Sequence, residues 1–202
     1  LGLTGGAGSE DQAALPGRVR WRLRPAWGGA QAEIAADCCT AQPLTLRAAL
    51  GLGALQLHIA DGQSQWPAGV LAGLGTPWNT VQPQGRLQLV TTGLALQWAA
   101  GRMQLQGQAR LDALDMSSRL STLRPMGSYR LLLQGGSGGQ APQLTLSTLD
   151  GALLLSGNGQ WVGQRLRFTG EASAAPERAA ALANLLNIIG RRSGARSIIT
   201  LG

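Results

Sequence analysis

The stretch 102–111, RMQLQGQARL, alternates without interruption between two kinds of side chain. One parity holds methionine, leucine, glycine and alanine, and the other holds only arginine and glutamine. Successive side chains of a β-strand point to opposite faces, so this period of two predicts a strand with one apolar and one polar face. The polar face carries no acid, base or nucleophile. We therefore interpret the strand as architecture, whose polar side meets water or a partner and whose apolar side needs a cover.

Similar runs recur along the chain, separated by glycine-rich or proline-containing turns. They predict further strands over residues 18–24, 30–36, 44–50, 55–59, 85–89, 94–98, 128–134, 143–148, 152–157, 165–172 and 197–201. We expect Pro25 to end the first of these strands. Residues 61–84 show no period and predict an irregular loop with at most one helical turn, at 67–73. Residues 112–127 predict a break. The glycines at 135–139 and 157–159 fit hairpin connections and not a phosphate loop, because no lysine follows them.

One segment, 176–189, has apolar residues at helical spacing. Pro176 suits the first turn of a helix, Glu177 suits its positive end, and Gly190 suits its C-cap. We expect Leu182, Leu185 and Leu186 to be buried between this helix and the sheet. It is the single long helix that the sequence predicts.

The order of these elements defines the fold class. Strands follow one another without a βαβ alternation, which predicts a mainly β protein with a curved, mostly antiparallel meander sheet. With one amphipathic C-terminal helix as cover, the sheet must stay open and half-barrel-like, or stack as a sandwich. We expect a single β-rich domain over 17–202. Residues 1–16 are glycine-rich and begin at Leu1, and we interpret them as a flexible linker from a membrane anchor that has been removed.

The chain is strongly basic, with a net charge of +7, and all of its 17 basic residues are arginine. The arginines are scattered except in two short groups, 18–24 and 191–196. A nucleic-acid-binding surface needs basic residues clustered on one face, so we expect no nucleic-acid partner.

Catalytic constellations are lacking in the sequence. His58 is the single histidine, on the polar parity of a predicted strand, and a triad with Asp61 and Ser64 is an unfavourable geometry for neighbours in sequence. Asp112 and Asp115 fall in the predicted break and fit turn or capping hydrogen bonds. We predict that the protein is not an enzyme and uses no cofactor.

The two cysteines, Cys38 and Cys39, are adjacent in sequence. A vicinal disulfide between them requires a strained ring, and the other use of such a pair is a metal or redox site, for which the sequence offers no second ligand cluster. One histidine and one cysteine pair cannot build an ordinary zinc site, so we expect no metal.

Three stretches carry a resemblance to a known family. They are PMGSYRL at 125–131, LLLSGNGQWVGQRLRFTGEA at 153–172 and LANLLNIIGRR at 182–192. Together they resemble the type II secretion system protein N family, most clearly from about residue 125 onward. The positions to which we assign a structural role are Tyr129, Gly157, Gly159, Trp161, Phe168, Leu182, Leu185, Leu186 and Gly190.

The resemblance implies a bacterial periplasmic domain, tethered to the inner membrane by an N-terminal segment that this chain does not contain. It implies a non-enzymatic accessory or assembly role, with the secretin or the inner-membrane platform proteins as partners. We expect Arg191, Arg192 and Arg196 to form a candidate docking patch. The alternative function is an envelope module that binds a lipid or another hydrophobic ligand on the curled apolar face of its sheet.

Overall fold

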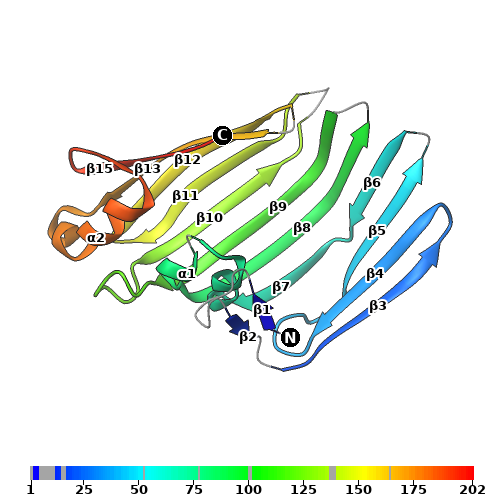
Figure 1. Ribbon diagram of the computed structural model, residues 1–202, viewed down its shortest axis with the longest axis horizontal. Helices are drawn as coiled ribbons and strands as arrows, with labels where there is room; N and C mark the ends of the chain where they lie inside the picture. The colour runs from blue at the N-terminus through cyan, green and yellow to red at the C-terminus, as the bar shows by residue number, and fades with distance from the viewer. Residues whose placement is uncertain are drawn as a thin grey trace.

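The strands of the protein form one long antiparallel sheet that curves without closing (Figure 1). The computed structural model describes residues 2–4, 12–14, 17–51, 53–76, 78–99, 102–136, 140–163 and 165–202. Within these residues the main sheet is 13-stranded, and its path runs from β14 at one edge to β3 at the other. Consecutive strands are neighbours almost everywhere. The predicted antiparallel meander and open sheet are therefore confirmed.

The elements follow the alternating segments of the sequence closely. The main-sheet strands are β3 (Val19–Ala26), β4 (Gly29–Ala36), β5 (Leu44–Gly51), β6 (Ala54–Ile59), β7 (Gly62–Pro67), β8 (Gln84–Ala99), β9 (Arg102–Ser117), β10 (Gly127–Gln134), β11 (Gln143–Gly151), β12 (Leu153–Val162), β13 (Arg165–Ala174), β14 (Arg191–Ser193) and β15 (Arg196–Leu201). The helical elements are η2 (Ala68–Leu74), α1 (Trp78–Val81), η3 (Pro176–Arg178) and α2 (Ala179–Ile189).

Two short strands lie outside the main sheet. β1 (Gly2–Thr4) and β2 (Gln12–Ala14) pair with each other and contact η2. They fall within the segment 1–16 that we interpret as a linker.

The centre of the sheet is the pair of long strands β8 and β9. Their register shifts between Thr92 and Ala95, where β8 holds one residue more than β9. Gly93 and Gly107 meet at this bulge with φ of 57° and 74°, a region that favours glycine because it lacks a Cβ. A bulge bends its strand and increases the local twist, so this point contributes to the curvature of the sheet.

The segment 61–84 is more regular than its sequence predicts. β6 pairs with the second half of β8, and β7 pairs with the first half, so the two short strands share one long neighbour. Asp61 spans the gap between them, since its Oδ1 accepts a hydrogen bond of 2.6 Å from the Gly93 N–H. The prediction of an irregular loop was wrong for β7 and α1. The helical turn predicted at 67–73 corresponds to η2.

Two other boundaries were wrong for physical reasons that the structure makes clear. Pro25 does not end the first strand, because it lies on the edge strand β3, where a missing N–H can face away from the sheet. The predicted break at 112–127 is shorter, because β9 continues to Ser117 and pairs with β10 beyond a second bulge. The sequence also predicts a turn at 99–101, before the strand at 102–111, and residues 100 and 101 of this turn lie outside the described residues.

The hydrophobic core lies at one end of the sheet. There α2 contacts β13, β14 and β15, and η2 contacts β8. Leu182, Leu185 and Leu186 of α2 are fully or almost fully buried in this cluster. The Ser197 hydroxyl, completely buried, donates a hydrogen bond of 2.6 Å to the Leu186 carbonyl and ties α2 to β15. The prediction of a C-terminal helix packed on the sheet is confirmed, with η3 as its first turn.

Candidate docking surfaces

The sheet has two chemically different faces, and its register shows how they arise. We call the face that packs against α2 and η2 the inner face. This face holds one apolar residue from each of five neighbouring strands, paired in register: Leu23, Ala32, Leu46, Ile59 and Leu94. The outer face carries charged and amide side chains of β3, β4, β5, β6, β9 and β10, among them Arg20, Arg22, Arg24, Glu33, Arg47, His58, Gln104, Gln106, Arg110, Asp112 and Arg130. The polar face of 102–111 is therefore part of one continuous polar surface.

Among the described residues, the helical elements α2 and η2 cover the inner face at one end of the sheet. Trp21 and Leu23 of β3 are exposed by 72% and 63%, and Leu50 of β5 is exposed by 72%. Trp21 lies opposite Ile34, so these side chains belong to the same apolar surface that is buried farther along the sheet. A large exposed apolar patch on a folded protein is a typical interaction surface. We call the exposed inner face of β3–β6, which carries Trp21, Leu23, Leu50 and Leu55, the apolar apron.

The predicted basic patch lies at the opposite edge. Arg191 and Arg192 are exposed on β14, and Arg196 begins β15, across a hairpin whose turn contains Gly194. Arg196 is not free, because its Nη1 lies 3.2 Å from Glu171 Oε2. The structure places the three arginines in one hairpin at the edge strand, not around the end of the helix alone.

The prediction that the glycines at 157–159 form a hairpin connection was wrong, because these glycines have a steric role inside β12. Gly157 and Gly159 lie inside β12, on the inner face, paired with Gly170 and Phe168 of β13. A Cβ on Gly157 would collide with the Phe168 ring, and a Cβ on Gly159 would come within 3.1 Å of it. The glycines therefore make the space in which the buried Phe168 lies flat across its neighbours. Trp161, farther along the same face, is half-buried.

Gly190 is the C-cap of α2, as the sequence predicts, but its backbone is extended, with φ of −169°. Its position is explained by close packing, because a Cβ there would lie 2.6 Å from the Ile198 carbonyl oxygen. The chain turns at this point from the helix directly into β14.

Tyr129 lies on the inner face of β10 and is buried among Met116, Met126 and neighbouring core residues. Its hydroxyl has no hydrogen-bond partner within the described part of the protein. Burial raises the pKa of the Tyr129 hydroxyl well above its ordinary value. The group is therefore neutral at every physiological pH and fills space in the core.

His58, Asp61 and Ser64 do not come together as a catalytic triad. His58 is exposed on the outer face of β6, opposite Arg47 and Ala95. Asp61 is engaged by the Gly93 N–H, and the buried Ser64 hydroxyl accepts a hydrogen bond of 2.9 Å from the Trp66 indole. Each side chain has a separate structural environment.

The carboxylates Asp112 and Asp115 lie in β9, where the sequence predicts a break. Asp112 is buried and accepts two hydrogen bonds from the Arg130 guanidinium, at 2.7 and 2.8 Å. These bonds hold the pKa of Asp112 below its ordinary value, against the opposing effect of burial. Asp115 accepts a bond of 2.6 Å from Arg86. The interpretation as turn or capping residues was wrong, because both carboxylates form cross-strand ion pairs.

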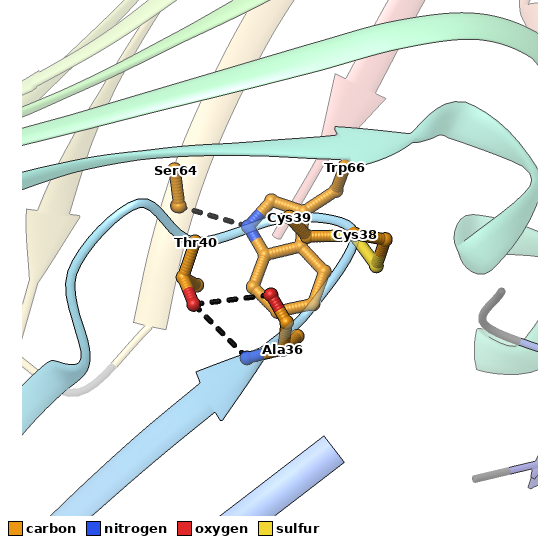
Figure 2. The surroundings of a disulfide bond; sticks show 6 residues. All are labelled: Ala36, Cys38, Cys39, Thr40, Ser64 and Trp66. Atoms are coloured by element: carbon orange, nitrogen blue, oxygen red, sulfur yellow. Dashed lines mark hydrogen bonds between the residues drawn. A yellow bond between two sulfur atoms is a disulfide. The ribbon is translucent and has the colours of Figure 1, made fainter. Parts of the chain in front are cut away.

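Cys38 and Cys39 form a vicinal disulfide in the turn after β4 (Figure 2). Cys39 is buried, and its carbonyl accepts a hydrogen bond of 2.7 Å from the Gln65 N–H of β7. Thr40 closes the turn, because its hydroxyl bonds both the N–H and the carbonyl of Ala36. As a disulfide, the pair offers no thiolate to a metal ion. Figure 2 shows the Trp66 indole of β7 alongside this turn, which connects β4 to β5 in sequence and is hydrogen-bonded to β7.

The described residues contain no group of three or more histidine, cysteine, aspartate or glutamate side chains placed to hold a metal ion. Among the described helices, none combines the length and the apolar character needed to cross a bilayer.

These features define a mainly β protein built on one open antiparallel sheet, with a polar outer face and a partly exposed apolar inner face. The chain belongs to the type II secretion system protein N family, whose family model matches residues 4–199. The match extends the resemblance seen in the C-terminal stretches to almost the whole chain. No curated protein and no solved structure matched it.

Proposed function

We propose that this protein is a non-enzymatic periplasmic scaffold of the type II secretion system. The observation that carries the proposal is the family match over 4–199, which makes the chain a component of this secretion system. The partners in this proposal are the secretin or the inner-membrane platform proteins. A segment outside this chain would anchor the protein in the inner membrane.

The structure supports a scaffold through its surfaces. The sheet ends in edge strands, β3 and β14, and unpaired edges are ready templates for binding another chain. Both edges carry arginines, and the apolar apron includes the inner face of the edge strand β3. The outer-face ionisable groups described above are held in ion pairs or exposed to solvent.

The vicinal disulfide supports the periplasmic location. Disulfides persist in oxidising compartments such as the bacterial periplasm and are rare in the cytosol. The Cys38–Cys39 bond fits that compartment.

The test of the scaffold is capture of the purified chain by each periplasmic component of the secretion system in turn. We expect one or more components to retain the chain, and deletion of its gene to reduce secretion. If every component fails to retain it and secretion is unchanged by the deletion, the proposal is wrong.

One observation favours a second candidate function, the binding of a lipid or another hydrophobic ligand. The apolar apron exposes Trp21, Leu23, Leu50 and Leu55 on a single face of a curved sheet. Such a face suits an acyl chain as well as a protein side chain. Native mass spectrometry of the purified chain separates the two functions: a copurified phospholipid favours the lipid, and the mass of the chain alone favours the scaffold.

A further inference from the structure

We infer that the free edge of β3 binds an extended, acidic segment of a partner protein as an additional strand of the sheet. The inference rests on the proposed scaffold function and names the surface and the chemistry of the partner. It begins with the backbone. β3 is the last strand of the main sheet and pairs with β4 alone among the described strands.

The register shows which backbone groups of β3 are available. Asp37 donates its N–H to the Arg18 carbonyl across the β3–β4 pair, so this is a hydrogen-bonded position. Inward and outward positions alternate along an antiparallel strand, which directs the N–H and C=O groups of Val19, Trp21 and Leu23 away from β4. Pro25 continues the same series, and its missing N–H falls on the free side. The edge therefore offers a row of donors and acceptors that ends at a proline.

The side chains of β3 define what would pair with that row. On the inner face Trp21 and Leu23 are largely exposed, and an added strand would cover them with apolar side chains. On the outer face stand Arg20, Arg22 and Arg24. Opposite charges on neighbouring strands stabilise a sheet, so the outer positions of the added strand would be acidic.

The arginines of β3 are only partly neutralised within the chain. Arg20 lies 2.7 Å from Asp37, and Arg24 lies 3.9 Å from Glu33. Arg22 makes no ion pair with any described residue. The strand therefore keeps positive charge for a partner, and a segment that alternates between acidic and apolar residues matches both of its faces.

The same charges argue against a second copy of this chain as the occupant. If two β3 strands paired antiparallel, arginines would lie against arginines. If β3 paired with β14 of another molecule, they would approach Arg191 or Arg192, which lie on opposite faces of β14. Like charges directly opposite each other on neighbouring strands are destabilising. The two edges are thus protected from each other and open to an acidic strand.

Two substitutions at Leu23 separate the backbone contribution from the side-chain contribution. Leu23→Pro removes an outward N–H and fills the edge with a ring, which β3 already tolerates at Pro25. Leu23→Ala keeps the N–H and shortens the side chain. Arg22→Gln removes a charge that has no ion-pair partner among the described residues. Equal circular dichroism spectra and melting temperatures would verify that each variant folds.

The probes are overlapping peptides that tile the periplasmic parts of the other type II secretion proteins, with binding measured by fluorescence polarisation. We expect the binding peptides to alternate between acidic and apolar residues, and to lose binding when lysine replaces their acids. Leu23→Pro should weaken binding about tenfold or more, and Leu23→Ala less. Arg22→Gln should weaken binding at low salt and make little difference at high salt.

The inference would be overturned if no peptide binds, if the binding peptides lack this pattern, or if Leu23→Pro binds as well as the native chain. A dimer in sedimentation velocity that Leu23→Pro converts to monomer would make a second copy the occupant and would also overturn it. Full secretion components captured equally by the native chain and Leu23→Pro would leave the scaffold standing and refute the β3 edge. Failure of all components to bind the native chain would refute the scaffold itself.

Discussion

Arg130 of β10 holds Asp112 of β9 with two parallel hydrogen bonds, Nε to Oδ1 at 2.7 Å and Nη2 to Oδ2 at 2.8 Å. The pair lies on the outer face at the centre of the sheet, and Arg110 Nε approaches the same carboxylate at 3.5 Å. A bidentate arginine–carboxylate contact is directional as well as charged. It therefore stabilises the register of β9 and β10 next to the bulge that separates their two paired segments.

This contact predicts a pH dependence of folding. The pKa of Asp112 is lower in the folded protein than in the unfolded chain, so its stabilising effect is complete above the unfolded value of about 3.9 and is lost as the pH falls through the folded value. Asp112→Asn should reduce the free energy of unfolding at neutral pH by about 1.5–3 kcal/mol. Urea unfolding from pH 2 to 7 should show the difference shrinking toward acid. A constant difference across that range would contradict the assignment.

The buried face of α2 predicts a large loss of stability on truncation. Leu182 and Leu185 contact the core cluster and are 0% and 2% exposed. Leu185→Ala should reduce the free energy of unfolding by about 2–5 kcal/mol, through lost apolar burial and the cavity left behind. Ile188 on the same helix is 48% exposed, so Ile188→Ala is the matched control with a much smaller effect. Equal melting temperatures for the two variants would show that α2 does not pack as described.

The glycines beneath Phe168 predict an effect of the opposite kind, overpacking. Gly157→Ala would bring a Cβ into the Phe168 ring and within 2.9 Å of the Gly170 Cα. We expect a cost of about 1–3 kcal/mol from the displacement of these groups. Asn158 is the control, because it is exposed on the other face of β12 and Asn158→Ala should change stability by less than about 0.5 kcal/mol. Chemical denaturation of both variants measures the contrast.

The arginines of β14 predict a separation between stability and binding. Arg191 and Arg192 are exposed, so replacing both by glutamine should leave the melting temperature nearly unchanged. If they form a docking patch, capture by a secretion component should weaken most at low salt, where screening is least. Capture that is equal for the native chain and the double variant at every salt concentration would assign these residues to the hairpin alone.

His58 offers a test of the non-enzymatic role. It is exposed on the outer face of β6, and neither Asp61 nor Ser64 is available to it. His58→Ala should leave secretion in cells unchanged at equal protein level. A large loss of secretion with normal folding would point to chemistry at this position.

The alternation of apolar and polar residues was enough to predict the class of fold. Strands such as 44–50 and 128–134 were found because a half-buried strand must alternate, and the helix at 176–189 because its leucines recur at helical spacing. The family resemblance likewise depended on local stretches of sequence. Local sequence pattern gave wrong predictions where the position of a residue in the sheet determines its structure. Pro25 continues the edge strand β3, and Gly157 and Gly159 lie inside the internal strand β12.

The tertiary structure decided which residues meet. No local signal joins Asp112 to Arg130, or places Phe168 over glycines of the preceding strand, because these contacts depend on a cross-strand register set by bulges and turns. The tertiary structure also determines which part of the inner face is covered. Trp21 and Leu185 are both apolar residues on amphipathic elements. Leu185 of α2 packs in the core between the helix and the sheet, while Trp21 lies exposed on the edge strand β3, because one helix can cover only one end of so long a sheet.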